Sequence, residues 1–147
     1  MIIVLITGRP LEISWLPPSG AALFCAWYPG EKGGDAIASV LFGDVNPSAK
    51  LPVSFPRSTG QLPDFYNYLP SDRGYYHKPG SYEKPGRDYV FDSTTALFPF
   101  GFGLSYTNFS IKGLEVNKNK LFAKDTIIVF SSVTNIGTRD GAEVVQV

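Results

Sequence analysis

The apolar residues of this chain follow two different patterns, and one type of sheet cannot hold both. Residues 2–7 (IIVLIT) and 21–27 (AALFCAW) are continuous apolar runs, as expected of parallel strands that are covered on both faces. Residues 109–116 (FSIKGLEV) alternate instead, which is typical of antiparallel strands with one buried face. The sequence therefore predicts an α/β part followed by an all-β part.

The α/β part is predicted to run strand, helical turn, strand, helix. The helical turn is expected at residues 10–15, between the two apolar runs. The helix is expected to open at Gly30 and Glu31, where an acidic side chain suits the helix dipole, and to end at Gly43. Its buried face would carry three apolar residues at helical spacing: Ile37, Val40 and Leu41.

The all-β part is predicted to contain three strands, at residues 109–116, 126–135 and 142–147, separated by turn signals. A β-sandwich needs about seven strands, so we expect an incomplete one. Both ends of the chain fall inside predicted strands, which favours a segment of a longer polypeptide.

Residues 97–110 (LFPFGFGLSYTNFS) lie where the first pattern gives way to the second. Gly101 and Gly103 permit backbone conformations that other residues avoid. Four aromatic side chains can pack on both sides of this segment: Phe98, Phe100, Phe102 and Tyr106. We therefore predict a rigid, aromatic-rich junction rather than a flexible linker.

The segment before this junction, residues 57–96, shows no regular pattern. It contains six of the chain's eight tyrosines and four of its prolines. An irregular stretch of about 40 residues is unusual in a compact domain, and it typically forms a functional loop or a wrap between domains.

Composition and short motifs exclude several classes of function. Thirteen basic residues offset thirteen acidic ones, which gives no electrostatic argument for nucleic acid, and no apolar stretch is long enough to span a membrane. Cys25, which we expect to be a buried and inert thiol, and His77 are the only residues of their types. They cannot form a disulfide or a zinc site within the chain, and we expect no metal or cofactor.

Paired carboxylates would suit glycoside hydrolysis, in which one acts as an acid and the other as a nucleophile or base. The candidates are Glu31, Asp35, Asp44, Asp88 and Asp92. The context of each favours an ordinary role, as a helix-start charge, a turn former or a solvated loop residue. We therefore assign no catalytic residue in this chain.

Three long segments, in this order, closely resemble the C-terminal half of family 3 glycoside hydrolases, the β-glucosidase and β-xylosidase group: GRPLEI (8–13), AWYPGEKGGDAIASVLFGDVNPSAKLPVSFP (26–56) and LFPFGFGLSYTNF (97–109). The resemblance implies a fold class, the end of an α/β sandwich domain at residues 1–56 joined to an incomplete fibronectin type III-like β-sandwich at 108–147. Residues 57–107 would form the tyrosine- and proline-rich loop and the junction. Gly33 and Gly34 would serve close helix packing.

The family resemblance also implies where the chemistry lies. The family's nucleophile is an aspartate in an N-terminal barrel, and its acid/base is commonly a glutamate upstream of the strand that residues 2–7 resemble. Neither position exists in this chain, so we expect it to be inactive alone and the parent enzyme to cleave terminal β-linked sugars. Family members are typically secreted or periplasmic.

The tyrosine-rich loop is where the resemblance places contacts with substrate. Four of its residues combine stacking faces with hydrogen-bond donors and are the predicted substrate-binding residues: Arg73, Tyr75, Tyr76 and His77. The same face could instead meet a second subunit in a homodimer. A different class of function stays open, a non-catalytic carbohydrate-binding or interaction module that stacks sugars on tyrosines. Packing across the junction is the plainer explanation of those tyrosines.

Overall fold

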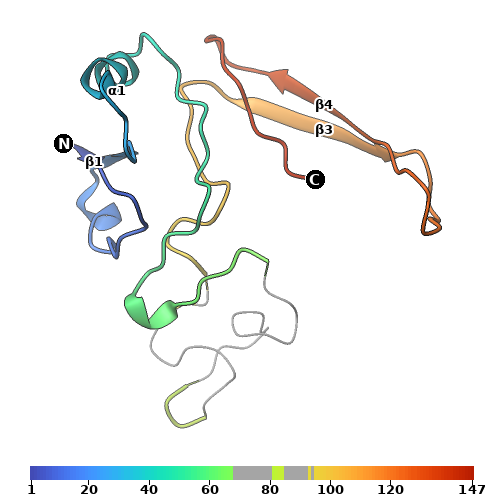
Figure 1. Ribbon diagram of the computed structural model, residues 1–147, viewed down its shortest axis with the longest axis horizontal. Coiled ribbons are helices and arrows are strands. Elements are labelled where there is room, and N and C mark those ends of the chain that lie inside the picture. Colours follow the sequence, from blue (N-terminus) through green and yellow to red (C-terminus); the bar gives the residue numbers. More distant parts are fainter. Residues whose placement is uncertain (68–80, 85–92, 94) are drawn as a thin grey trace.

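A computed structural model describes residues 1–67, 81–84, 93 and 95–147 of the chain (Figure 1). It contains two two-stranded sheets, one parallel and one antiparallel. The elements are β1 (Ile2–Leu5), η1 (Pro17–Ser19), β2 (Ala22–Cys25), α1 (Gly33–Leu41), η2 (Thr59–Gln61), β3 (Phe109–Val116) and β4 (Val129–Asn135), where η marks a short 3-10 helix. A part with a parallel strand pair and a helix therefore precedes a part with an antiparallel pair, in the order that the apolar patterns predict.

The two apolar runs pair as parallel strands, as predicted, but both are shorter than the runs. β1 pairs with β2 from Ile2↔Ala22 to Leu5↔Cys25. The Thr7 hydroxyl donates to the Arg9 carbonyl at 2.9 Å and turns the chain, and Trp27 has a φ of 52°. These local turns end the strands before the apolar pattern ends.

The predicted helical turn at residues 10–15 is wrong in position, because the short helix η1 begins at Pro17. Pro17 and Pro18 have φ fixed near the helical value, which favours the turn there. The helix α1 begins at Gly33 rather than Gly30, since Gly30 has a positive φ of 75°. Its predicted apolar face is half-buried among the described residues.

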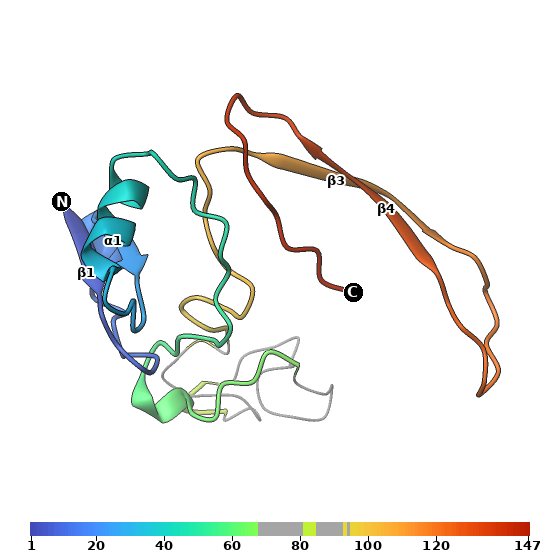
Figure 2. The ribbon, with the colours of Figure 1, turned by 45° about the horizontal axis from the view of Figure 1, so that its top comes forward.

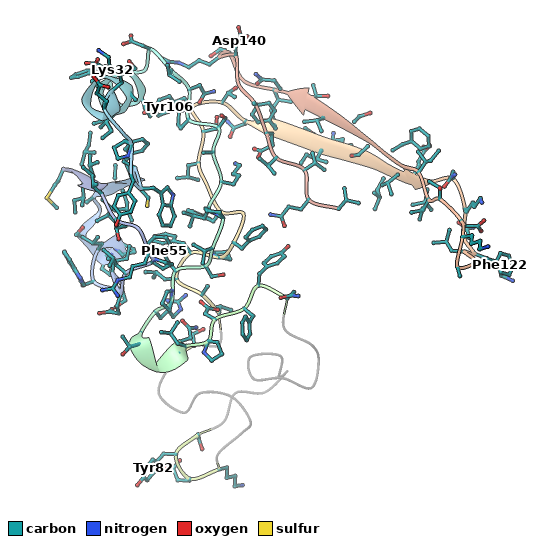
Figure 3. All side chains as sticks on the ribbon, viewed as in Figure 1. Lys32, Phe55, Tyr82, Tyr106, Phe122 and Asp140 are labelled. Carbon is teal, nitrogen blue, oxygen red and sulfur yellow. The ribbon has the colours of Figure 1, made fainter. Side chains whose placement is uncertain are left out.

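Phe55 is the centre of a small core that joins the α/β part to the junction. Phe55, Ile13 and Leu16 are only 2–3% exposed. The Phe55 ring lies 6.0 Å from Trp27 and 6.4 Å from Phe98, centroid to centroid. Figure 3 shows Phe55 between the α/β part and the long segments that follow it. Further partly buried residues pack around this core: Ile3, Leu5, Leu11, Leu23, Cys25, Leu51 and Leu97.

The two glycines at the start of α1 differ from each other. A Cβ at Gly33 would lie 2.6 Å from the Pro29 ring, so the predicted close packing is confirmed there. A Cβ at Gly34 would meet no atom of the described residues within 4 Å, so the described part of the chain does not support the same prediction for Gly34.

Strands β3 and β4 form a long antiparallel hairpin that points away from the α/β part (Figures 1 and 2). Its register shifts between Lys112 and Glu115, where Gly113 has a φ of 69°, as in a β-bulge. Among the described residues no other strand pairs with this hairpin. Most of its apolar side chains are therefore exposed, although the sequence alternates as a half-buried strand would; Phe109 and Val129 are half-buried.

The third predicted strand, residues 142–147, is not a strand in this structure. The segment runs back beside the junction, and its side chains, not its backbone, make the contacts described below. The expectation of three strands is corrected to two, because a strand requires a partner edge that the local pattern does not reveal.

Candidate functional site

The junction is built by two segments that run antiparallel. Residues 51–55 and 97–102 exchange backbone hydrogen bonds, among them Phe55 N to Phe98 O at 2.8 Å and Leu51 N to Phe102 O at 2.9 Å. Phe98 also packs against Phe102, with ring centroids 5.2 Å apart. The predicted packing role of the aromatic residues is confirmed, because the segment is held by a ladder and by ring contacts.

The two junction glycines serve different purposes. Gly101 has a φ of 80°, which L side chains rarely adopt, as the sequence predicted. Gly103 is needed for space, because a Cβ there would lie 2.6 Å from the Ala49 carbonyl oxygen.

Asn46 anchors the chain just after α1 to both flanks of the hairpin. Its side-chain oxygen accepts from Ser105 Oγ at 2.9 Å and from Tyr106 N at 2.8 Å. Its side-chain nitrogen donates to the Asp140 carbonyl at 2.8 Å. The Tyr106 hydroxyl donates to the Val40 carbonyl of α1 at 2.9 Å, and Figure 3 shows Tyr106 and Asp140 near this end of the molecule.

Residues 139–143, after β4, contact residues 43–50, which follow α1 and are called the α/β tail here, in the same order along both segments. Arg139 donates to the Gly43 carbonyl at 2.9 Å, and its guanidinium lies 5.7 Å from the Tyr106 ring. Lys50 lies 2.9 Å from Glu143, and the two side chains are only 13% and 17% exposed. The hydrogen bond from Lys50 lowers the pKa of the Glu143 carboxyl.

The base of the tyrosine-rich loop is closed by one buried amide. Gln61, at the end of η2, is 1% exposed. Its oxygen accepts from Arg57 N at 2.6 Å, and its nitrogen donates to the carbonyls of Ser93 and Thr95 at 2.9 and 3.0 Å. The amide thereby joins the segment that enters the loop to the segment that leaves it.

The first loop residues lie against the junction. The Tyr66 ring is 5.0 Å from the Phe100 ring, and the Tyr66 hydroxyl donates to Gln146 Oε1 at 2.6 Å. Near it, burial raises the pKa of the Asp64 carboxyl, and Asp64 Oδ2 has no hydrogen-bond partner within the described part of the chain.

The predicted substrate contacts lie outside the described residues: Arg73, Tyr75, Tyr76 and His77. The carboxylates Asp88 and Asp92 lie outside them as well. Glu31, Asp35 and Asp44 are exposed, and Asp35 makes only a surface ion pair with Lys32 at 3.9 Å. Their exposure agrees with the ordinary roles predicted for Glu31, Asp35 and Asp44.

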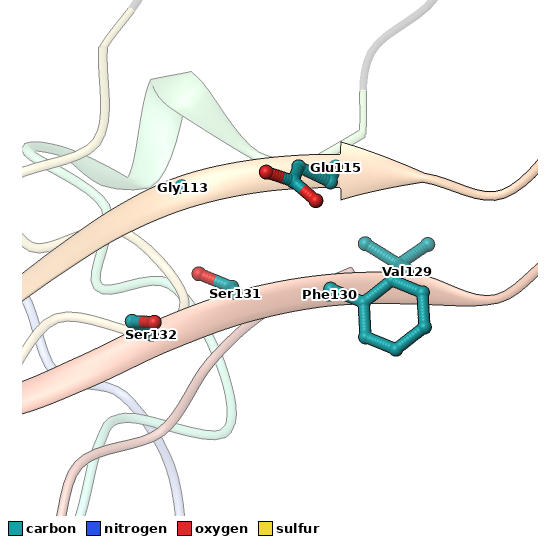
Figure 4. A pocket seen from close by; sticks show the side chains of 6 residues that line it. All are labelled: Gly113, Glu115, Val129, Phe130, Ser131 and Ser132. Carbon is teal, nitrogen blue, oxygen red and sulfur yellow. The ribbon is translucent and has the colours of Figure 1, made fainter.

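Other potential sites carry little chemistry. A pocket of about 420 Å³ lies on the hairpin (Figure 4), but its lining holds one carboxylate, Glu115, together with Ser131 and Ser132. In the described ranges no cluster of three histidine, cysteine or acidic side chains could hold a metal. Burial raises the pKa of the half-buried Cys25 thiol, which keeps it protonated and unreactive.

Sequence analysis missed Gln61, Asn46 and the Lys50–Glu143 pair. Each acts on a partner between 32 and 94 residues away, and no local period or motif marks such a partner. An asparagine before Pro is an ordinary turn residue, and nothing in a single sequence distinguishes a glutamine before Leu-Pro.

Within the described residues, no helix has the length and apolarity needed to cross a membrane. Residues 1–106 match the glycosyl hydrolase family 3 C-terminal domain. Across 99% of its length the chain is 41% identical to a periplasmic β-glucosidase of Salmonella typhimurium and 41% identical to a β-xylosidase of Formosa agariphila. In both cases it spans 19% of the relative's length.

The chain is also similar to a small part of solved β-glucosidase structures. A β-glucosidase from Erythrobacter marinus is 43% identical, with a TM-score of 0.79 over 94% of this chain and 17% of that chain. A β-glucosidase from Listeria innocua, solved with isofagomine, is 36% identical, with a TM-score of 0.74 over 92% of this chain and 19% of that chain. The chain therefore belongs to glycosyl hydrolase family 3, in which it matches the C-terminal domain.

Proposed function

We propose that this chain is the C-terminal part of a β-glucosidase- or β-xylosidase-type hydrolase that removes terminal β-linked sugars. The observation that carries this proposal is the coverage: 99% of the chain aligns, yet it spans only 19% of relatives that are called β-glucosidase and β-xylosidase. The catalytic carboxylates then belong to a part of the enzyme that these 147 residues do not include.

The exposed carboxylates of the chain support the proposal that the catalytic carboxylates lie elsewhere in the enzyme. Retaining hydrolysis needs two carboxyl groups about 5–5.5 Å apart, one of them kept protonated near neutral pH. Glu31 and Asp35 are exposed near the start of α1, whereas a catalytic acid needs an enclosed site. Neither is suited to act as the acid.

In the proposed layout residues 1–56 end an α/β sandwich domain and residues 108–147 begin a fibronectin type III-like domain. The parallel pair β1–β2 with α1 supports the first assignment, and the antiparallel hairpin β3–β4 supports the second. The relative from Salmonella typhimurium is called periplasmic, which supports a periplasmic or secreted location.

The tyrosine-rich loop, including Arg73, Tyr75, Tyr76 and His77, is proposed to contact the aglycone, the part of the substrate beyond the cleaved bond. Two tyrosines of the loop that the structure describes support this role, since Tyr66 is 60% exposed and Tyr82 is 77% exposed. Exposed aromatic faces suit stacking on sugar rings. They also support the rival proposal of a non-catalytic sugar-binding module, or of contact with a second subunit.

A chimera tests the proposed function. In the Listeria innocua β-glucosidase, the segment that matches this chain is replaced by these 147 residues. We expect the chimera to hydrolyse aryl β-glucosides and the isolated chain to show no turnover above the uncatalysed rate. A folded but inactive chimera would contradict the proposal. So would an isolated chain whose turnover is lost when one of its own carboxylates is changed.

The rival sugar-binding function predicts a different result. In affinity electrophoresis, β-glucan in the gel would slow the migration of the isolated chain without being cleaved. Alanine at Tyr66 and Tyr82 would abolish this retention of the protein. Retention that needs no tyrosine would argue against stacking.

A further inference from the structure

Packing between regular elements does not hold the hairpin β3–β4 against the described α/β part. Among the described elements, β3 and β4 contact each other, and neither contacts β1, β2 or α1. The core around Phe55 takes its described members from the α/β part and the junction, and none from residues 108–147. Parts of a chain that are joined in this way move relative to each other unless an interface holds them. The orientation of the hairpin therefore depends on the segments that flank it.

The segment after β4 supplies such an interface. The chain turns back at the base of the hairpin (Figures 1 and 2) and meets the α/β tail at three successive points. The points are Arg139 with the Gly43 carbonyl, the Asp140 carbonyl with the Asn46 amide, and Glu143 with Lys50. A single contact would allow the hairpin to turn about it, whereas three contacts spread along the segment do not.

Two glycines let this segment approach its neighbours closely. A Cβ at Gly137 would overlap the Thr107 hydroxyl. A Cβ at Gly141 would lie 2.6 Å from Asn46 Nδ2, the atom that donates to the Asp140 carbonyl, and 3.0 Å from Thr107 Cγ2. Neither glycine is among those with a positive φ, so both are needed for space. The segment is therefore fitted closely to the surface on which it lies.

We propose that residues 137–143 form a strap that locks the hairpin β3–β4 in one orientation against the α/β part. The docking surface of the strap is the α/β tail, residues 43–50. When the strap is released, the hairpin swings about its connection to the junction, while the α/β part keeps its own fold. The proposal concerns the conformation of this chain and does not depend on the activity of the parent enzyme.

Single-molecule energy transfer tests the strap, because it works at picomolar concentrations, at which chains do not associate. Dyes on Lys32→Cys in α1 and Lys120→Cys in the loop between β3 and β4 report the orientation of the hairpin. Dyes on Arg9→Cys and Lys32→Cys report the fold of the α/β part alone. The three labelled positions are exposed, and Cys25→Ala removes the native thiol.

Two variants release the strap in different ways. Arg139→Ala with Glu143→Ala removes the side chains at its two ends, and Gly141→Ala pushes the Asn46 amide away from its centre. Asp140→Ala is the matched control, because Asp140 meets Asn46 through its backbone carbonyl. Gly34→Ala is the control for an added methyl group, since it meets open space among the described residues.

For the orientation pair we expect one narrow distribution of transfer efficiency in the wild type and in both controls. The strap variants should raise a second population about tenfold, as the loss of charge-assisted hydrogen bonds would do. The pair within the α/β part should give the same efficiency in every variant.

Strap variants whose orientation distribution equals that of the wild type would overturn the inference. A broad wild-type distribution would do so too, because the strap would then fix no orientation. If the pair within the α/β part changes as well, the contacts hold the fold rather than the orientation, and the proposal fails. It also fails if Asp140→Ala has the same effect as the double variant.

Discussion

The ion pair between Lys50 and Glu143 shows how single residues tie the two parts of the chain together. Lys50 also donates to the Gly103 carbonyl at 2.8 Å, so its ammonium joins the α/β tail, the junction and the segment after β4. Because both side chains are mostly shielded from water, the pair is screened less than a surface pair.

Glu143→Gln is predicted to lower the free energy of unfolding of the chain by about 1 kcal/mol at neutral pH. Since Lys50 lowers the folded-state pKa of Glu143, this stabilisation is complete above the unfolded-state pKa and is lost as the pH falls through the folded-state pKa. Urea melts at neutral and strongly acidic pH should therefore show a difference only at neutral pH. Glu31→Gln, at an exposed site, is the control. An equal loss at both pH values would argue against the ion pair.

Contacts of this kind between single residues were the hardest to predict from the sequence. The aromatic residues of the junction were predicted to pack because several lie within a few positions of one another. Glu143 and Lys50 lie 93 residues apart, and a single sequence holds no local signal for such a pair. Gln61 escaped prediction for the same reason.

At the scale of elements, the hydrogen-bonded segments 51–55 and 97–102 are continued by a close backbone approach between Ala49 and Gly103. Gly103→Ala would place a Cβ 2.6 Å from the Ala49 carbonyl oxygen, two residues from Leu51, whose backbone N and O are hydrogen-bonded to Phe102 and Gly101. We predict a loss of about 1–3 kcal/mol, the usual cost of overpacking. Gly34→Ala is a control of opposite sign, because its Cβ would meet open space in α1. It should stabilise the chain by about 0.5–1 kcal/mol. Thermal melts of both variants measure the difference, and equal midpoints would contradict it.

The elements themselves were predicted well where apolar runs were long. Both parallel strands, the helix and the hairpin occur at the expected places. Their boundaries moved because turns decide them, as at Gly30 and at Trp27 with its positive φ. The segment 142–147 has a strand pattern and forms no strand, since pairing depends on a partner edge and not on the pattern alone.

At the scale of the whole molecule, the hairpin β3–β4 exposes an apolar face. Ile111 and Val133 are cross-strand partners, 49% and 45% exposed, and Phe122 near the hairpin tip is 81% exposed (Figure 3). The order of an α/β part and a β part was predictable from the change in apolar pattern. What covers the apolar face of the hairpin was not predictable, because alternation shows that one face of a strand is apolar but not what packs against it.

Exposed apolar faces and open strand edges favour association between chains. We predict that the isolated 147-residue chain self-associates at micromolar concentration, and that Ile111→Lys with Val133→Lys shifts it towards monomer. The two lysines replace the apolar pair on one face and repel their copies on a second chain. Thr134→Lys is the matched control, because its side chain lies next to Val133 in sequence and points to the opposite face. Sedimentation velocity measures the distribution of species. A monomeric wild-type chain with a cooperative melt would show that the hairpin face needs no partner, and an equal effect of Thr134→Lys would assign the association to charge rather than to this face.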